Sequence, residues 1–376
     1  MLFISDVTVR YGSVAALKNL SLTVNAGEIL AILGPSGSGK STLLQVLAGL
    51  QPVASGEVRT DDRLLSNQDF MVPPEQRGIG MVFQDFALWP HMTVHDTIRF
   101  PLDSVSGSRE SKAARVNELL GLVQLAGFGG RFPHELSGGQ RQRVAIARAL
   151  AAHPSFVLLD EPMASLDAQL RETMRVDLAR ILHEQNATAL YVTHDRTEAM
   201  VVADRVALLH GGVISQIGTP HELYEQPLSR FNAEFLGPVN WIPADVITAS
   251  PDPEKPAGVQ LAGGPHVTAH ARSTLSAGQH GSAMVRPEDL EIVSSGTSGH
   301  VWHGTVQSAY YLGMHWQVRV AVPELGSLHL YHTRGVKEGQ TVQISLRRPA
   351  VWLLPDQPAA SEAAGRHVAG LGGASR

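Results

Sequence analysis

The residues best suited to chemistry lie in a glycine-rich stretch at positions 34–41, which fits the pattern G-x-x-x-x-G-K-[ST]. Its members are Gly34, Pro35, Ser36, Gly37, Ser38, Gly39, Lys40 and Ser41, and Thr42 follows them. A glycine-rich loop that runs into a helix aims backbone N–H groups and the positive end of the helix dipole at one point, which suits a polyphosphate. The pattern predicts that Lys40 reaches the β- and γ-phosphates and that the Ser41 hydroxyl ligates Mg²⁺. A glycine-rich turn without a ligand is the alternative.

Two carboxylates, Asp160 and Glu161, follow an apolar run at 156–159. A buried parallel strand delivers the residues at its C-terminal end to the same sheet edge as the glycine-rich loop. We therefore expect Asp160 to hold Mg²⁺, directly or through water, and Glu161 to polarise the attacking water as a general base. Without the glycine-rich loop, acidic residues at the end of a strand are often only the cap of a helix that follows.

The most specific sequence feature is a serine followed by two glycines at the start of a predicted helix. It comprises Leu136, Ser137, Gly138, Gly139 and Gln140. Such a helix start offers a second anion site, made of a hydroxyl and free N–H groups. One nucleotide hardly needs two phosphate sites in one chain, so we expect a head-to-tail pair of subunits in which each lends its second site to the other's γ-phosphate. A well-capped helix is the alternative.

The elements that must position these residues alternate between strands and helices. The predicted strands are 2–9, 17–24, 28–33, 56–60, 78–83, 156–159 and 187–192, and the helical patterns are 41–48, 93–126, 138–152 and 168–185. Strands that alternate with helices predict a mainly parallel α/β sheet, which would bring the chemistry-bearing residues to one edge.

Composition limits the classes of protein that this chain can belong to. With 376 residues, 43% of them hydrophobic and 17% charged, it has the length of two or three globular domains. Its net charge of −5 provides no basic field for nucleic acid. The absence of cysteine excludes disulfides and thiolate catalysis, and it fits a reducing compartment. No signal peptide is expected, and no apolar stretch approaches the ~20 residues of a spanning helix, so a membrane role requires a partner.

The character of the sequence changes after Leu236. From there to Leu354, short alternating runs punctuated by glycine and proline predict a small all-β barrel or sandwich. We expect one domain at 1–236, a second at 237–356, and a disordered tail at 357–376 that is rich in small residues. His300, His303 and His315 could suggest a metal cluster, but no carboxylate accompanies them at ligand spacing, and a structural role is expected.

Together these residues resemble the ATP-binding subunits of ABC transporters, in particular those of importers that depend on a binding protein. The resemblance follows chain order up to about Pro355. The matching segments are Walker A at 34–41, the glutamine loop at Gln84, the signature at 136–140, Walker B with its catalytic acid at 156–161, the D-loop at 165–167 and the switch histidine His194. Tyr11 lies where the family stacks an aromatic ring on adenine. One departure is the order Ala164, Ser165 before Leu166 and Asp167, where the family usually reads Ser-Ala-Leu-Asp.

The resemblance implies a P-loop ATPase that binds ATP and Mg²⁺ as a head-to-tail homodimer. It implies catalytic roles for Glu161, His194, Lys40 and Gln84, and metal ligands at Ser41, Gln84 and Asp160. The nucleotide-binding residues implied are Tyr11, the loop at 34–42, the signature residues Ser137 to Gln140, and Asp167 of the D-loop, which crosses to the partner subunit.

The same resemblance implies integral membrane permease subunits that contact a groove at 84–94, where Trp89 is a candidate anchor. A periplasmic or lipoprotein solute-binding protein would act indirectly, and the subunit would lie on the cytoplasmic face of the inner membrane. The segments 235–240 and 285–290 resemble the linker and small β domain of importers for iron(III), polyamines, sulfate, molybdate, maltose or phosphonates. Residues 87–94 favour iron(III) or polyamine. Alternatives are a soluble ABC-type ATPase acting on DNA or ribosomes and a non-catalytic nucleotide sensor.

Overall fold

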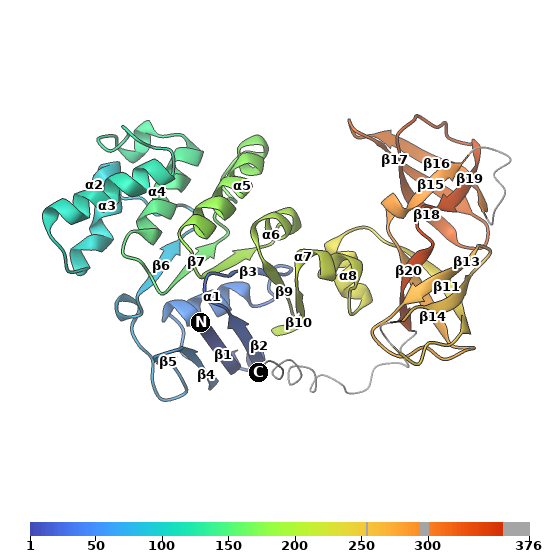
Figure 1. Cartoon of the computed structure of the whole chain (residues 1–376), viewed down its shortest axis with the longest axis horizontal. Coiled ribbons are helices and arrows are strands. Elements are labelled where there is room, and N and C mark those ends of the chain that lie inside the picture. The colour runs from blue at the N-terminus through green and yellow to red at the C-terminus, as the bar shows by residue number, and fades with distance from the viewer. Residues whose placement is uncertain (253–254, 294–300, 356–376) are drawn as a thin grey trace. The chain divides into compact units, whose positions relative to one another are not determined.

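A computed structural model describes residues 1–252, 255–293 and 301–355 of the chain (Figure 1). The tail expected at 357–376 and His300 lie outside these ranges. The chain forms two compact units, one covering Met1–Pro220 and the other starting at His221.

The first unit is built on a six-stranded sheet with the order β10-β9-β3-β8-β7-β6. Its strands are β3 (Ile29–Leu33), β6 (Ile79–Val82), β7 (Phe156–Asp160), β8 (Ala189–Thr193), β9 (Arg205–His210) and β10 (Val213–Gly218). All run parallel except β10, which pairs antiparallel with β9 at the edge. Every residue of β3 and β8 is buried, as expected for central strands of a parallel sheet that is covered on both faces. The predicted parallel α/β sheet is confirmed.

A second, antiparallel sheet has the order β2-β1-β4-β5. Its strands are β1 (Leu2–Tyr11), β2 (Val14–Val24), β4 (Ser55–Thr60) and β5 (Leu64–Ser66). In β1, Leu2 and Ile4 and, after an irregularity in the strand, Val7 and Val9 are buried in a core that is shared with α1 and the six-stranded sheet. The alternating pattern of the sequence therefore reflects a sheet with one buried face.

The helices of the first unit follow the predicted patterns, with one interruption. They are α1 (Lys40–Ala48), α2 (Val94–Arg99), α3 (Arg109–Leu122), α4 (Gly138–Leu150), α5 (Ala168–Glu184) and α6 (Arg196–Val202), with short 3₁₀ turns η1 (Pro74–Gln76), η2 (Phe100–Ser104) and η3 (Pro133–Glu135). The helical pattern at 93–126 is broken into α2, η2 and α3, because Pro101 lacks an N–H group and cannot continue an α-helix. Figure 1 shows α2, α3 and α4 gathered into a helical group.

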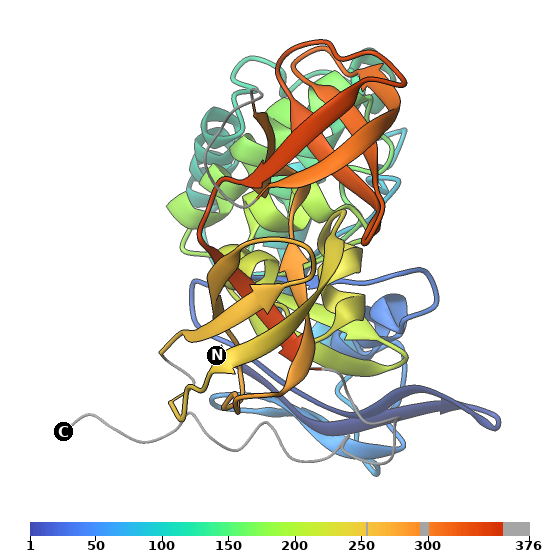
Figure 2. The same cartoon turned by 90° about the vertical axis from the view of Figure 1, so that its right-hand side faces the viewer.

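The second unit contains two short helices and two β structures (Figure 2). The helices are α7 (Pro220–Glu225) and α8 (Arg230–Leu236). A closed barrel consists of β11 (Asn240–Thr248), β12 (Ala257–Leu261), β13 (His266–His270), β20 (Ala350–Pro355) and β14 (His280–Val285). A five-stranded sheet consists of β15 (Leu290–Val293), β19 (Thr341–Leu346), β16 (Trp302–Tyr311), β17 (Trp316–Val322) and β18 (Gly326–His332), preceded by the 3₁₀ turn η4 (Pro287–Asp289). One hydrophobic core joins barrel and sheet.

The boundary between the units differs from the one expected at 236/237, because α7 and α8 belong to the second unit. Arg286, which is 2% exposed, donates to the carbonyl oxygens of Ala233 at 3.0 Å, Gly237 at 3.1 Å and Tyr224 at 2.9 Å. The Trp352 indole N–H also donates to a carbonyl oxygen in the α7–α8 connection. The sequence change after Leu236 marks where strands replace helices, whereas the compact unit begins earlier.

None of the helices in the described ranges has the length and apolar character needed to cross a membrane.

Candidate nucleotide-hydrolysis site

The sheet brings the predicted site residues to one edge. β3, β8 and β7 lie side by side and parallel, with Leu33 paired to Thr193 and Asp160 paired to Val192. The glycine-rich loop leaves the carboxyl end of β3, while Glu161 and His194 follow the ends of β7 and β8. Ligands of open α/β sheets bind beyond these carboxyl ends.

The loop between β3 and α1 requires glycine at two positions. A Cβ atom at Gly34 would lie 2.2 Å from the carbonyl oxygen of Leu209, and one at Gly39, whose φ is +109°, would lie 2.7 Å from that of Ala16. Inside the loop, the Ser38 hydroxyl is buried and has no hydrogen-bond partner among the described residues. A tight backbone cradle that holds an unpartnered hydroxyl fits a polar, anionic ligand.

Lys40 starts α1 and is folded into this cradle. Its Nζ donates to the carbonyl oxygens of Gly34 at 2.8 Å and Pro35 at 3.0 Å, and the residue is 7% exposed. Burial lowers the pKa of Lys40, and the nearby carboxylates of Glu161 and Asp160 oppose that shift. The first turn of α1 carries no acidic side chain, so nothing there competes with a phosphate for the N–H groups.

The two predicted acids lie at the end of β7 and differ in their surroundings. Burial raises the pKa of Asp160, Glu161 adds to the rise, and Lys40 opposes it. Glu161 adopts a left-handed backbone conformation with φ of +42°, and its N–H donates to the carbonyl oxygen of Val192 at 2.9 Å. A non-glycine residue in this region is uncommon and is held there by its surroundings. The chain turns sharply here, directly beside the end of β8.

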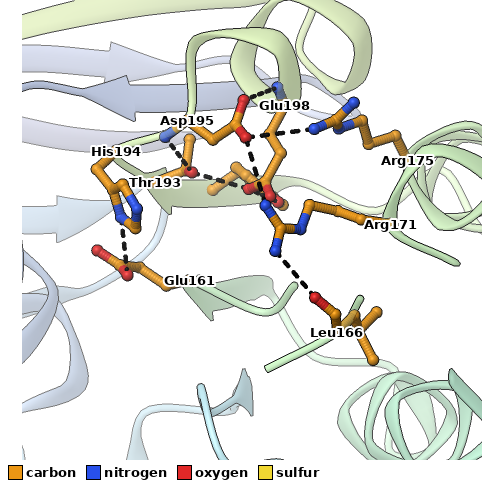
Figure 3. Close-up of polar contacts among 9 residues, drawn as sticks. Glu161, Leu166, Arg171, Arg175, Thr193, His194, Asp195 and Glu198 are labelled. Carbon is orange, nitrogen blue, oxygen red and sulfur yellow. Dashed lines mark hydrogen bonds and ion pairs between the residues drawn. The ribbon is translucent and has the colours of Figure 1, made fainter. Parts of the chain in front are cut away.

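The turn brings Glu161 against the residue that follows β8. Nδ1 of His194 lies 3.0 Å from Oε2 of Glu161, and the two side chains face each other in Figure 3. The His194 side chain is 60% exposed and that of Glu161 is 24% exposed, so the pair can be approached from solvent. A carboxylate and an imidazole in contact can orient a water molecule and accept its proton.

The predicted metal ligands offer only oxygen donors. Ser41 is exposed in the first turn of α1, Asp160 ends β7, and Gln84 is exposed just beyond β6, the neighbour of β7. Mg²⁺ prefers oxygen ligands and is usually held by one or two carboxylates together with substrate phosphates. No cluster of three or more His, Cys, Asp or Glu side chains able to hold a metal occurs in the described ranges. The donor set fits Mg²⁺ that arrives with a nucleotide.

The signature residues form a fully capped helix start within one chain. Ser137 Oγ accepts from the N–H of Gln140 at 3.3 Å, and Gln140 Oε1 accepts from the N–H of Ser137 at 3.0 Å. This capping box is what the alternative interpretation, a well-capped helix without a second anion site, predicts.

Two further predicted residues lie at the surface of the first unit. Tyr11 ends β1 with 47% exposure, and its hydroxyl lies 3.4 Å from Oε1 of Gln45. Asp167 caps α5 by accepting from the N–H of Leu170 at 2.9 Å. The tyrosine ring is free to stack on a planar ligand, and the D-loop is anchored at its C-terminal end by a helix cap.

Comparison with known proteins identifies the family. A family model described as "ABC transporter" matches residues 17–164, and one described as "TOBE domain" matches residues 283–354. The spermidine/putrescine import ATP-binding protein of Nitrosospira multiformis is 41% identical over 317 residues, which cover 83% of this chain and 85% of that protein. The maltose/maltodextrin import ATP-binding protein of Escherichia coli K12 is 37% identical over 349 residues, covering 91% and 92%. The chain belongs to the ABC import ATP-binding proteins. It is an ATPase of that family.

Other similarities agree with the assignment but span different solutes. The sulfate/thiosulfate import ATP-binding protein of Synechococcus elongatus is 42% identical over 302 residues, covering 77% of this chain and 87% of that protein. A dimeric post-hydrolysis structure of the ATP-binding cassette MJ0796 with ADP and Pi has a TM-score of 0.50 and 34% identity, and it covers 58% of this chain and 99% of that one. The P-loop ATPase domain and the TOBE β domain predicted from the sequence are therefore confirmed.

The sequence reasoning missed the arginine that holds the glutamine loop of this ABC ATPase. Arg148, 7% exposed on α4, donates to the carbonyl oxygens of Ala87 and of Phe86, the latter at 3.0 Å. Phe86 and Ala87 have φ of +65° and +44°. The Arg148 guanidinium also lies 5.3 Å from the Trp89 ring centroid. The helix that follows the signature thus stabilises the strained loop after Gln84, and no motif in the sequence marks Arg148 for this contact.

The departure in the D-loop has a structural counterpart. The Ser165 hydroxyl donates to the carbonyl oxygen of Gln84 at 3.3 Å, a contact that alanine, the usual family residue, cannot make. Among the C-terminal histidines, His315 packs on Tyr331 with ring centroids 4.5 Å apart, whereas His300 lies outside the described residues.

Proposed function

We propose that this ATPase works as a head-to-tail dimer around two ATP–Mg²⁺ and drives uptake of a small solute through membrane permease subunits. The observation that carries the proposal is the meeting of Lys40, Asp160, Glu161 and His194 at one edge of the sheet. The dimer is supported by the similarity to the MJ0796 cassette, whose structures are dimeric, and by the second candidate anion site at the start of α4.

The residues take distinct roles in this proposal. The loop at 34–42 and Lys40 bind the phosphates, and Tyr11 stacks on adenine. Ser41, Asp160 and Gln84 would hold Mg²⁺, which neutralises phosphate charge when bound. Glu161 accepts the proton of the attacking water, and His194, which contacts Glu161, orients the water and the γ-phosphate. Ser137, Gly138, Gly139, Gln140 and Asp167 contact the nucleotide that is bound to the partner subunit.

The variant Glu161→Gln tests the catalytic role and the dimer together. Glutamine keeps the size of the side chain but cannot accept the proton, so turnover should fall by roughly 10²–10⁴-fold while ATP binding persists. Size-exclusion chromatography with light scattering should find this variant as a dimer in saturating ATP–Mg²⁺. Glu184→Gln, on the exposed surface of α5, is the matched control and should retain turnover. A monomeric Glu161→Gln protein at saturating ATP would contradict the sandwich mechanism.

We place the permease contact at 84–94 and the subunit on the cytoplasmic face of the inner membrane, with a solute-binding protein acting indirectly. Support comes from the relatives' description as import proteins and from Trp89, which packs on Phe100 with ring centroids 4.8 Å apart at the start of the helical group. No nucleic-acid partner is proposed. Trp89→Ala should weaken co-purification with co-expressed permease subunits while leaving ATP binding unchanged.

For the solute, we favour a polyamine or iron(III). Polyamine has the added support that the compared relatives include spermidine/putrescine importers, whereas iron(III) rests on residues 87–94 alone. Sulfate, molybdate, phosphonate and sugars are the alternatives, and the sulfate and maltose relatives keep two of them open. Uptake of labelled putrescine, iron(III), sulfate and maltose in a strain that lacks the gene, with and without complementation, distinguishes them.

A further inference from the structure

Two arginines of α5 converge on the residue that follows the switch histidine (Figure 3). Arg175 donates to Oδ2 of Asp195 at 3.3 Å, and the guanidinium of Arg171 lies 3.8 Å from the same oxygen. The side chains of Arg171, Arg175 and Asp195 are 29%, 15% and 25% exposed. At such partial burial, attraction between the charges is screened less than at the open surface.

Asp195 is also fixed by the backbone around it. Its Oδ1 accepts from the N–H of Glu198 at 3.0 Å, which makes it the N-cap of α6, and its own N–H donates to Oγ1 of Thr193 at 2.9 Å. The buried Glu198 carboxylate accepts from the hydroxyls of Thr193 at 2.8 Å and Tyr191 at 2.7 Å. A displacement of Asp195 must therefore move the junction of β8 and α6, and that junction carries His194.

Arg171 makes one more contact, and it lies in the D-loop. Its Nη2 donates to the carbonyl oxygen of Leu166 at 2.9 Å, while its Nη1 faces Asp195. A planar guanidinium with two separate groups of donors is suited to hold two acceptors in fixed relative positions. Arg171 thus connects the D-loop to the β8–α6 junction, and His194 at that junction contacts Glu161 at 3.0 Å.

We infer that Arg171 is a positioning residue that transmits the position of the D-loop to His194. Docking of a second copy against the D-loop shifts the Leu166 carbonyl, Arg171 carries this shift to Asp195, and the contact between His194 and Glu161 responds. This inference rests on the proposed roles of Glu161 and His194. Its consequence is that hydrolysis depends on the partner subunit through contacts within one chain, beyond any direct contact with the nucleotide.

The simpler interpretation is that both arginines only pack α5 against the sheet. Arg175 fits this interpretation well, since its hydrogen bond and ion pair within the described ranges both go to Asp195, and it is the more buried of the two arginines. Arg171 differs because it bridges two loops. A packing role predicts loss of stability when Arg171 is removed, whereas a positioning role predicts loss of turnover that disappears when His194 is absent.

A double-mutant cycle on the full-length chain distinguishes these roles. Steady-state ATPase kinetics and thermal unfolding are measured for Arg171→Ala, His194→Ala and the double variant. We expect Arg171→Ala to lower kcat about tenfold with KM within about twofold of the unsubstituted protein, and to change kcat less than about twofold in the His194→Ala background. The control is Arg180→Ala, since Arg180 lies on the same helix and its ion pair with Glu184 is exposed. This variant should keep the kcat of the unsubstituted protein.

Two further variants address the remaining ambiguity. Asp195→Asn removes the charge that Arg171 contacts at the β8–α6 junction but keeps a good N-cap for α6. It should therefore reproduce the loss of kcat even if Arg171→Ala folds poorly. Arg171→Lys keeps the charge but cannot hold both acceptors, so its kcat should stay low. Rescue by lysine, losses that multiply in the double variant, or normal kcat in Asp195→Asn would each overturn the inference. If His194→Ala or Glu161→Gln kept normal turnover, the proposed function itself would fail instead.

Discussion

Nδ1 of His194 lies 3.0 Å from Oε2 of Glu161, and the two residues follow the ends of neighbouring parallel strands, β8 and β7. The contact joins a side chain that is 60% exposed to one that is 24% exposed. Since Glu161 is turned out of β7 by a φ of +42°, the pair depends on a backbone feature as well as on two side chains. The pair is therefore positioned by the turns that follow two strands of the sheet.

The pair predicts a large catalytic effect for His194. His194→Ala should reduce kcat by about 100-fold or more, because Glu161 would lose the group that orients the water, while the affinity for ATP should hardly change. Assays of phosphate release measure kcat, and equilibrium nucleotide binding measures the affinity for ATP. His183→Ala is a suitable control, since the His183 side chain is 48% exposed on α5. Among the ion pairs of the described ranges, His183 takes part only in the one with Asp204, at 3.7 Å. Equal effects of both substitutions would contradict a special role for His194.

The partly buried Asp160 predicts a pH dependence of stability in the nucleotide-free protein. Burial and Glu161 raise its folded-state pKa above the ordinary 3.8, so the folded state binds the proton more tightly than the unfolded state. The free energy of unfolding should then fall as pH rises from about 4 through the raised pKa, and level off above it. Asp160→Asn should be more stable than the unsubstituted protein at neutral pH, and the difference should shrink on acidification. Urea unfolding between pH 4 and pH 8 measures it, and a pH-independent difference would contradict it.

Much of the site could be predicted because its residues are tied to backbone geometry that leaves a sequence pattern. Gly34 and Gly39 are needed where a Cβ atom would collide with neighbouring carbonyl oxygens, and Asp160 follows an apolar strand that any parallel sheet buries. The residues that meet these requirements lie within a few positions of one another in the chain, so their spacing forms a pattern that can be recognised in the sequence. The parallel order of β3, β8 and β7 then follows from the alternation of strands and helices.

The contacts that the sequence did not reveal are long-range and made by arginine. Arg148 reaches Phe86 and Ala87, and Arg171 reaches Asp195, across turns whose separation is set only by the folded chain. A basic residue on a helix is normally solvated, so nothing local distinguishes these two from Arg180. The contacts of Arg286 with α7 and α8, which lie before the expected boundary at 236/237, are long-range in the same way and leave no pattern in the sequence.

Arg148 predicts a structural effect that is confined to the glutamine loop. Arg148→Lys should lower the free energy of unfolding by about 2 kcal/mol, because lysine cannot satisfy both carbonyl oxygens and loses the planar contact with Trp89. The loop at 84–90 should also become more sensitive to limited proteolysis. Arg141→Lys, near the other end of α4, serves as the control. If Arg148→Lys left proteolysis of the loop unchanged, Arg148 would not be the residue that holds the loop in place.

Arg286 predicts the strongest stability effect in the second unit. It is buried, its guanidinium lies 4.0 Å from the Tyr224 ring centroid, and it donates to carbonyl oxygens of Tyr224, Ala233 and Gly237. Arg286→Met should cost about 3 kcal/mol or more, since several buried acceptors would lose a charged donor at once.

Tryptophan fluorescence during urea unfolding measures this cost selectively, because Trp241, Trp302, Trp316 and Trp352 lie in the second unit and only Trp89 lies in the first. Arg348→Met is the matched control. Arg348 contacts Asp289 at 3.3 Å and Glu225 at 3.5 Å, but its side chain is 61% exposed, so its loss should cost less than about 1 kcal/mol. If the two variants unfolded at the same urea concentration, Arg286 would not be the residue that holds α7 and α8 to the second unit.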